Sequence, residues 1–187
     1  MKKINRFLAL LLALALVAAL SACGGPDPLI GTWKGEIDLA DDMVESLNKA
    51  FEGQGGPSAA GYITALTMTL TLEFKDDGTF TRTYDLSKDK DSFVTGCAAF
   101  MRDMISSLSG VEVDDDTAAA ALGMPLEDYA LSVLDAMTES IEDETGTYKS
   151  DGKKISWNDE VNPYPIDGDV MTMQTSDIGE IVFNRVG

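Results

Sequence analysis

Alternation of apolar and polar residues is clearest at 63–74. One face of this run carries mostly apolar side chains and the other carries three threonines, which predicts a long strand with one buried face. Asp77-Gly78 follows and predicts a tight turn. Residues 79–85 are therefore the expected return strand of a hairpin, and a similar alternation at 29–39 predicts an earlier strand.

The spacing of apolar residues becomes helical in two places. Residues 40–51 begin with acidic residues, which suits the amino-terminal end of a helix, and carry a short apolar stripe of Met43, Leu47, Ala50 and Phe51. A longer helical segment spans about 86–142. Its two stripes are Phe93, Cys97, Phe100, Met104 and Leu108, and then Leu126, Ala130, Val133, Met137 and Ile141. Beyond Thr145 the period returns to two, and short strands are expected at 146–150, 153–158, 169–174 and 180–186, with turns between them.

The order of strands, helices and strands predicts a mainly β protein with a helical insertion at about 86–142, and so the α+β class. Several short strands with turns between them favour an antiparallel β-barrel or a strongly curved meander sheet. Two or three helices bury little apolar area by themselves. We therefore expect the insertion to pack against the strands within a single domain at 29–187.

The chain opens with a basic stretch and an apolar run at 7–20, which leads into Leu20-Ser21-Ala22-Cys23. A charged stretch followed by a short apolar run is typical of export signals. The run is shorter than the roughly 20 apolar residues that a membrane-spanning helix needs. Its end resembles the lipobox of bacterial lipoproteins.

The lipobox resemblance implies a signal peptide at 1–22, and a lipidated cysteine with a short tether at 23–28. It also implies diacylglycerol on the Cys23 thiol and an amide-linked chain such as palmitate, and two or more chains are enough for stable anchoring. The mature protein is then expected at the cell membrane on the extracytoplasmic side, or at an outer membrane if the source has one. The alternative is an ordinary secretory signal with a coincidental cysteine.

Charge and composition narrow the classes of function. The chain has 32 acidic and 14 basic residues, a formal net charge of −18, and no histidine. This acidity argues against nucleic acid as a partner. The lack of histidine removes most zinc sites and every histidine-based catalytic triad, and Cys97 on an apolar helix face is expected to be a buried hydrophobe. We expect no metal, no cofactor, no catalytic residues and no enzymatic activity.

Several short motifs resemble lipocalins and lipocalin-like bacterial lipoproteins. Gly31-Thr32-Trp33 opens the first strand, and the other motifs follow in the family's order. They are Phe74-Lys75-Asp76-Asp77-Gly78-Thr79-Phe80, Gly146-Thr147-Tyr148, Asp151-Gly152-Lys153-Lys154-Ile155 and Phe183-Asn184-Arg185-Val186. The resemblance implies a structural contact between Trp33 and Arg185 at the closed base of a barrel, a cation–π pair worth about 0.5–2 kcal/mol.

Apolar, methionine-containing strand faces are the candidate ligand-binding surface. The residues concerned are Leu66, Met68, Leu70, Phe80, Met171 and Met173. The same residues also fit an ordinary core, because small barrels either hold one ligand or fill their interior with side chains. The sequence thus favours a membrane-tethered, lipocalin-like module that binds a small apolar ligand or an envelope partner. The alternative is a protein-interaction module, an inhibitor or complex subunit, that uses the helical insertion.

Overall fold

The computed structural model describes residues 27–139, 141–157, 160–175 and 179–187. The predictions for the signal peptide and for Cys23 lie outside the described residues. Within them, the buried core begins at Leu29. Residues 27–187 therefore hold every described element together with the apolar side chains that pack it.

An antiparallel seven-stranded sheet forms the larger part of the β structure, in the order β4-β3-β2-β1-β10-β9-β8. Its strands are β1 (Gly31–Asp38), β2 (Thr67–Phe74), β3 (Thr79–Asp85), β4 (Glu144–Thr147), β8 (Ile166–Asp167), β9 (Val170–Thr175) and β10 (Gly179–Val186). A smaller antiparallel sheet has the order β5-β6-β7. Its strands are β5 (Lys149–Ser150), β6 (Lys154–Trp157) and β7 (Glu160–Pro163).

Together the two sheets follow the order of a meander in which the first strand lies beside the last. The hydrogen-bonded ladders are interrupted between β4 and β5, at Tyr148, and between β7 and β8. The smaller sheet nevertheless packs on the larger one, because the Trp157 ring stacks at 5.9 Å from Phe74 and 5.3 Å from Phe80. The described residues form a mixed α+β fold with a large antiparallel sheet, as the sequence predicts. The hydrogen-bonded ladders of the described strands do not close into a barrel.

The helices are α2 (Ala40–Ala50), the short 3-10 helix η1 (Ala59–Gly61), α3 (Lys90–Ser109), α4 (Asp115–Leu122) and α5 (Leu126–Glu139). The last three run between β3 and β4. The Asp114 side chain accepts a hydrogen bond from the Thr117 N–H and so caps α4. Gly110 and Gly123 end α3 and α4 in the left-handed conformation that glycine adopts easily.

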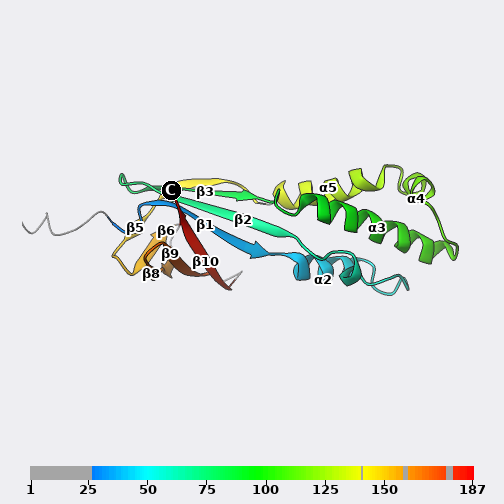
Figure 1. Cartoon of the computed structure of the whole chain (residues 1–187), viewed down its shortest axis with the longest axis horizontal. Coiled ribbons are helices and arrows are strands. Elements are labelled where there is room, and N and C mark those ends of the chain that lie inside the picture. Colours follow the sequence, from blue (N-terminus) through cyan, green and yellow to red (C-terminus); the bar gives the residue numbers. More distant parts are fainter. Residues whose placement is uncertain (1–26, 140, 158–159, 176–178) are drawn as a thin grey trace, which may run out of the picture.

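The described helices lie together at one end of an elongated molecule (Figure 1). The chain order explains this, because β1 leads into α2, β3 leads into α3, and α5 leads back into β4. Antiparallel pairing places these three junctions at the same end of the sheet. The turn between β2 and β3 lies at the opposite end, where Asp27 also enters the fold. The described chain thus enters far from its helices.

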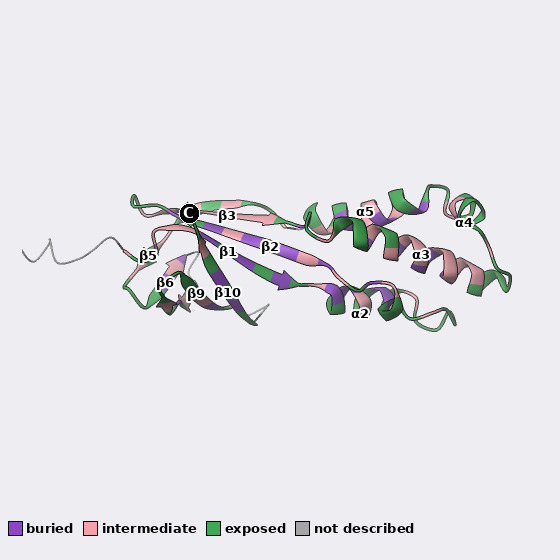
Figure 2. Ribbon diagram, viewed as in Figure 1, coloured by how far each residue is buried: buried purple, intermediate pink, exposed green. Residues whose placement is uncertain are grey.

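One continuous apolar core runs through the sheets and the helices (Figure 2). In β2, every second residue from Met68 to Phe74 is buried, as the alternation predicts. In α3, the buried side chains continue this core with Phe93, Cys97, Phe100, Met101 and Met104. Leu108, the last member of the predicted stripe, is not part of this core and is 54% exposed.

Two local predictions differ from the structure. Strand β2 begins at Thr67 rather than at 63, because residues 63–66 have no partner in the β1–β2 ladder. Ile63 is instead buried against α3. Strand β7 occupies part of the predicted turn at 159–165. Its Pro163 lies on an edge strand, where a missing N–H removes no ladder hydrogen bond.

Candidate functional site

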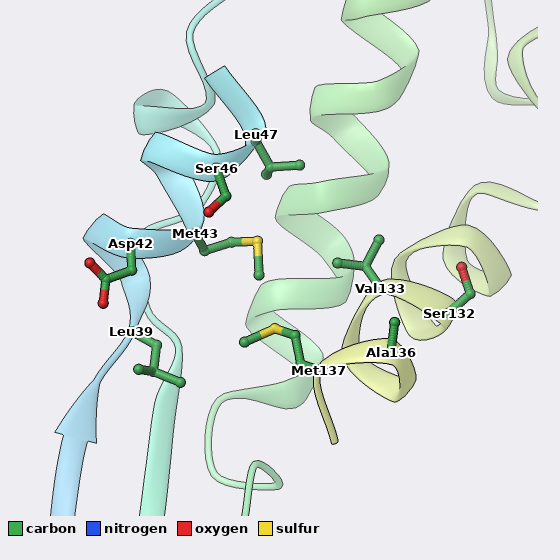
Figure 3. Close-up of a pocket in the computed structure, with 9 residues that line it drawn as sticks. All are labelled: Leu39, Asp42, Met43, Ser46, Leu47, Ser132, Val133, Ala136 and Met137. Atoms are coloured by element: carbon green, nitrogen blue, oxygen red, sulfur yellow. The ribbon is translucent and has the colours of Figure 1, made fainter. Parts of the chain in front are cut away.

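A groove of about 630 Å³ lies between α2 and α5 (Figure 3). Its wall on the α2 side consists of Leu39, Asp42, Met43, Ser46 and Leu47, and its wall on the α5 side consists of Ser132, Val133, Ala136 and Met137. The volume lies within the range of small-molecule sites, which is about 300–1,000 Å³. The arrangement suits a molecule of that size with an apolar body.

Helical periodicity builds both walls. Leu39, Met43 and Leu47 recur every four residues, as do Val133 and Met137 on α5, so each set forms one stripe along its helix. Met43 and Leu47 are buried, whereas the lining residues of α5 are half-buried or exposed. The groove is therefore a place where two amphipathic faces approach each other without closing.

The two methionines give the groove an adaptable lining. Figure 3 shows the thioether ends of Met43 and Met137 pointing into the space between α2 and α5, with α3 behind them. Methionine has an unbranched, polarisable side chain that adjusts to differently shaped apolar partners. This lining favours binding by shape and apolar contact rather than by fixed hydrogen bonds.

A second hollow, of about 410 Å³, adjoins the groove and is acidic. It is lined by Glu36, Ile37, Asp38, Leu39, Asp42, Glu180 and Ile181, so that Leu39 and Asp42 belong to both hollows. Lys88 Nζ lies 2.6 Å from Glu36 Oε2. Gln174 donates a hydrogen bond to Glu180, and Asp38 accepts one from the Ala40 N–H. Among the described residues no ion pair or hydrogen bond involves the Asp42 side chain.

The six strand residues predicted to bind a ligand lie in the core. Leu66, Met68, Leu70, Phe80, Met171 and Met173 are each at most 5% exposed. None of them lines the groove between α2 and α5. The sequence predicts apolar helix stripes that include Met43 and Met137, but it does not single these residues out as a site. The presence of a methionine on each stripe is the one sequence signal that points to the groove. Ligand binding by the six strand residues stays a prediction.

The structure brings Trp33 and Arg185 together. The guanidinium carbon of Arg185 lies 4.1 Å from the centre of the Trp33 ring. The same guanidinium donates hydrogen bonds to the backbone carbonyls of Ile30, at 2.8 Å, and of Pro28. The Trp33 indole N–H donates to the Leu29 carbonyl at 2.8 Å. This cluster connects the last strand to the entering chain and is far from the groove.

Cys97 is fully buried, and burial raises the pKa of its thiol to about 11. The thiol is therefore protonated at neutral pH and a poor nucleophile. Within the described ranges, no three histidine, cysteine or acidic side chains gather closely enough to hold a metal ion. No helix in this part of the chain is both long and apolar enough to cross a membrane.

Comparison with known proteins does not place this chain in a family. No family model matches the chain, and no curated protein matches it. Among solved structures, the chain is similar to the crystal structure of wild-type fluorescent protein UnaG, with 11% sequence identity and a TM-score of 0.27. The match covers 84% of this chain and 97% of the other. At that level the likeness carries no argument about fold or function.

Proposed function

We propose that this protein is a lipid-anchored, lipocalin-like binding module that holds a small apolar molecule in the groove between α2 and α5. The observation that carries the proposal is the groove itself, an open space of about 630 Å³ with an apolar, methionine-containing lining. A concave site of this volume with an apolar lining and a few polar groups is typical of small-molecule sites. The strand order supports the lipocalin-like part, since up-and-down barrels also place the first strand beside the last.

The proposed activity is binding without chemical change. The one described cysteine, Cys97, lies buried with a protonated thiol, and so does not supply a nucleophile. The lining of the groove offers two serines and one aspartate as polar groups. These groups suit orientation of a bound molecule, because a serine nucleophile needs an adjacent base.

The anchor is the second part of the proposal, and its support is the lipobox-like sequence that ends at Cys23. The described chain enters the fold at the end opposite the helices (Figure 1). A protein tethered through Cys23 on the extracytoplasmic side of the membrane would therefore hold its groove away from the lipid surface. The test is fractionation of cells that express the chain and its Cys23→Ala variant. Membrane retention of the wild type alone supports the anchor, and equal retention of the variant contradicts it.

A neutral apolar fluorophore, N-phenyl-1-naphthylamine, tests the groove. Ala136 is an exposed lining residue of α5, so Ala136→Trp fills the groove without changing the core. Ala120 is an exposed residue of α4 that does not line the groove, and Ala120→Trp is the matched control. We expect Ala136→Trp to weaken fluorophore binding at least tenfold, about 1.4 kcal/mol, and the control to bind like the wild type. Equal binding by all three proteins contradicts the proposal.

Exposed apolar residues in the helical segment favour the interaction module as a second candidate. Leu108 and Val111, at the end of α3, are 54% and 62% exposed. A photo-crosslinking residue at position 111, introduced in cells of the source organism, tests this surface. Capture of a specific protein there, and not from a probe at Asp76 in the β2–β3 turn, supports this candidate, whereas no capture from position 111 contradicts it.

A further inference from the structure

We infer that the groove selects a cationic amphiphile, whose apolar tail lies between α2 and α5 and whose positively charged head lies in the acidic hollow beyond Asp42. The inference rests on the proposed function, because it specifies the ligand class of the same groove. Its basis is that the two hollows adjoin, sharing Leu39 and Asp42 in their linings. A molecule with two chemically different ends therefore meets two chemically different surfaces.

The charged residues that line the two hollows are all acidic. Four carboxylates line the acidic hollow, namely those of Glu36, Asp38, Asp42 and Glu180, and no lysine or arginine lines either hollow. Two described lysines lie close to these carboxylates: Lys88, whose ammonium group is paired with Glu36, and Lys34, which lines a separate hollow together with Glu36 and Glu180. An anionic headgroup would meet unneutralised carboxylates here, and like charges placed together are strongly unfavourable.

Asp42 is the residue that connects the two surfaces. Its carboxylate lies where the apolar groove meets the acidic hollow, on the first turn of α2. Figure 3 shows the Asp42 side chain on the side of α2 that faces away from the two methionines and from α5. Among the described residues it has no partner, so a bound cation would form its first ion pair.

The spacing of the carboxylates favours an organic cation over a metal ion. In the described part of the chain no three acidic side chains converge on one metal-sized position. Carboxylates spread around a hollow of about 410 Å³ instead suit a bulky, diffuse charge such as a quaternary ammonium group. Such a group keeps little of its hydration and gains from both ion pairing and apolar contact.

Three decyl compounds test the inference, each measured by displacement of N-phenyl-1-naphthylamine from residues 24–187 at concentrations below micelle formation. They carry a cationic, a neutral and an anionic head: decyltrimethylammonium, decanol and decyl sulfate. A carboxylate close to a cation attracts it even in water. We expect the cation to bind about tenfold more tightly than decanol, and decyl sulfate about tenfold more weakly. Added salt should reduce the difference, because exposed charges are screened.

Asp42→Asn is the variant that isolates the charge. It should weaken decyltrimethylammonium about fivefold and leave decanol unchanged, whereas Asp76→Asn, which makes the same charge change in the β2–β3 turn, should alter neither. If decanol binds and the cation binds no more tightly, the ligand class is wrong and the proposed function stands. If the fluorophore binds but none of the three compounds displaces it, the ligand class is wrong; if the fluorophore itself does not bind, the proposed function is wrong as well. Equal losses in the two variants would also overturn the role of Asp42.

Discussion

Replacing Arg185 by methionine is expected to lower the free energy of unfolding by about 2–4 kcal/mol. Methionine keeps most of the apolar stem but loses the guanidinium that stacks 4.1 Å from the Trp33 ring, a contact worth about 0.5–2 kcal/mol. It also loses the two hydrogen bonds to the carbonyls of Pro28 and Ile30. Hydrogen bonds to charged groups contribute about 1.5–3 kcal/mol when buried.

The expected loss of about 2–4 kcal/mol is smaller than the sum of these contributions, because the Arg185 side chain is 22% exposed and solvent weakens its interactions. The pair between Arg185 and Asp169 is left out of the sum, since Asp169 is 84% exposed and such surface pairs contribute little. Arg185→Lys is the matched variant. Lysine keeps the positive charge over the Trp33 ring but lacks the planar guanidinium group that donates to both carbonyls. We therefore expect Arg185→Lys to lower the free energy of unfolding by about half as much as Arg185→Met.

Urea unfolding of residues 24–187, followed by tryptophan fluorescence, measures this effect. The chain has two tryptophans. A Trp157→Phe background leaves Trp33 as the reporter, so the signal comes from the ring that the guanidinium covers. A loss below 0.5 kcal/mol for Arg185→Met would refute the reasoning. Equal losses for the methionine and lysine variants would show that the charge over the ring contributes nothing and that the fork accounts for the whole effect.

The remaining predictions concern the packing of α3. Cys97 should resist alkylation in the native protein at pH 8 and react once urea unfolds it, as followed by mass spectrometry; rapid native labelling would contradict its burial. Gly96→Ala should destabilise by roughly 2 kcal/mol or more in urea unfolding, because a Cβ there would lie 2.2 Å from the Tyr62 carbonyl oxygen. Gly61→Ala, which meets nothing within 4 Å, should stay within about 0.5 kcal/mol, and equal effects of the two would refute the close approach. A double-mutant cycle of Tyr62→Phe and Asp103→Asn should give a coupling of about 0.5–1 kcal/mol at pH 7, after allowance for solvent exposure. The Tyr62 hydroxyl lowers the pKa of Asp103 from its ordinary 3.8, so the coupling should be present above that value and weaken as pH falls through the lower folded value. A coupling that does not change with pH would contradict this.

The local elements were largely predictable because their signals are local. The β2–β3 hairpin follows from alternation and from Asp77-Gly78, and the helix faces follow from their spacing. The start of β2 was misplaced because alternation at 63–66 continues without a ladder partner. Strand β7 was missed because proline excludes a central strand but not an edge strand.

The groove was not predictable because it depends on tertiary placement. Periodicity shows that Met43 and Met137 each belong to an apolar stripe, but not that the two stripes come near each other without closing. The same limit applies to the strand residues predicted to bind a ligand. Alternation predicts that these side chains face the interior. Only the packed structure shows that side chains from the helices share this core with them.

The pairing of β1 with β10 has a consequence for how the chain folds. Trp33 lies opposite Arg185, so the central ladder of the sheet joins residues from the two ends of the sequence. Contacts between distant residues require closure of a long loop before they stabilise anything, and they slow folding. The sheet therefore cannot be completed until its last strand has been synthesised.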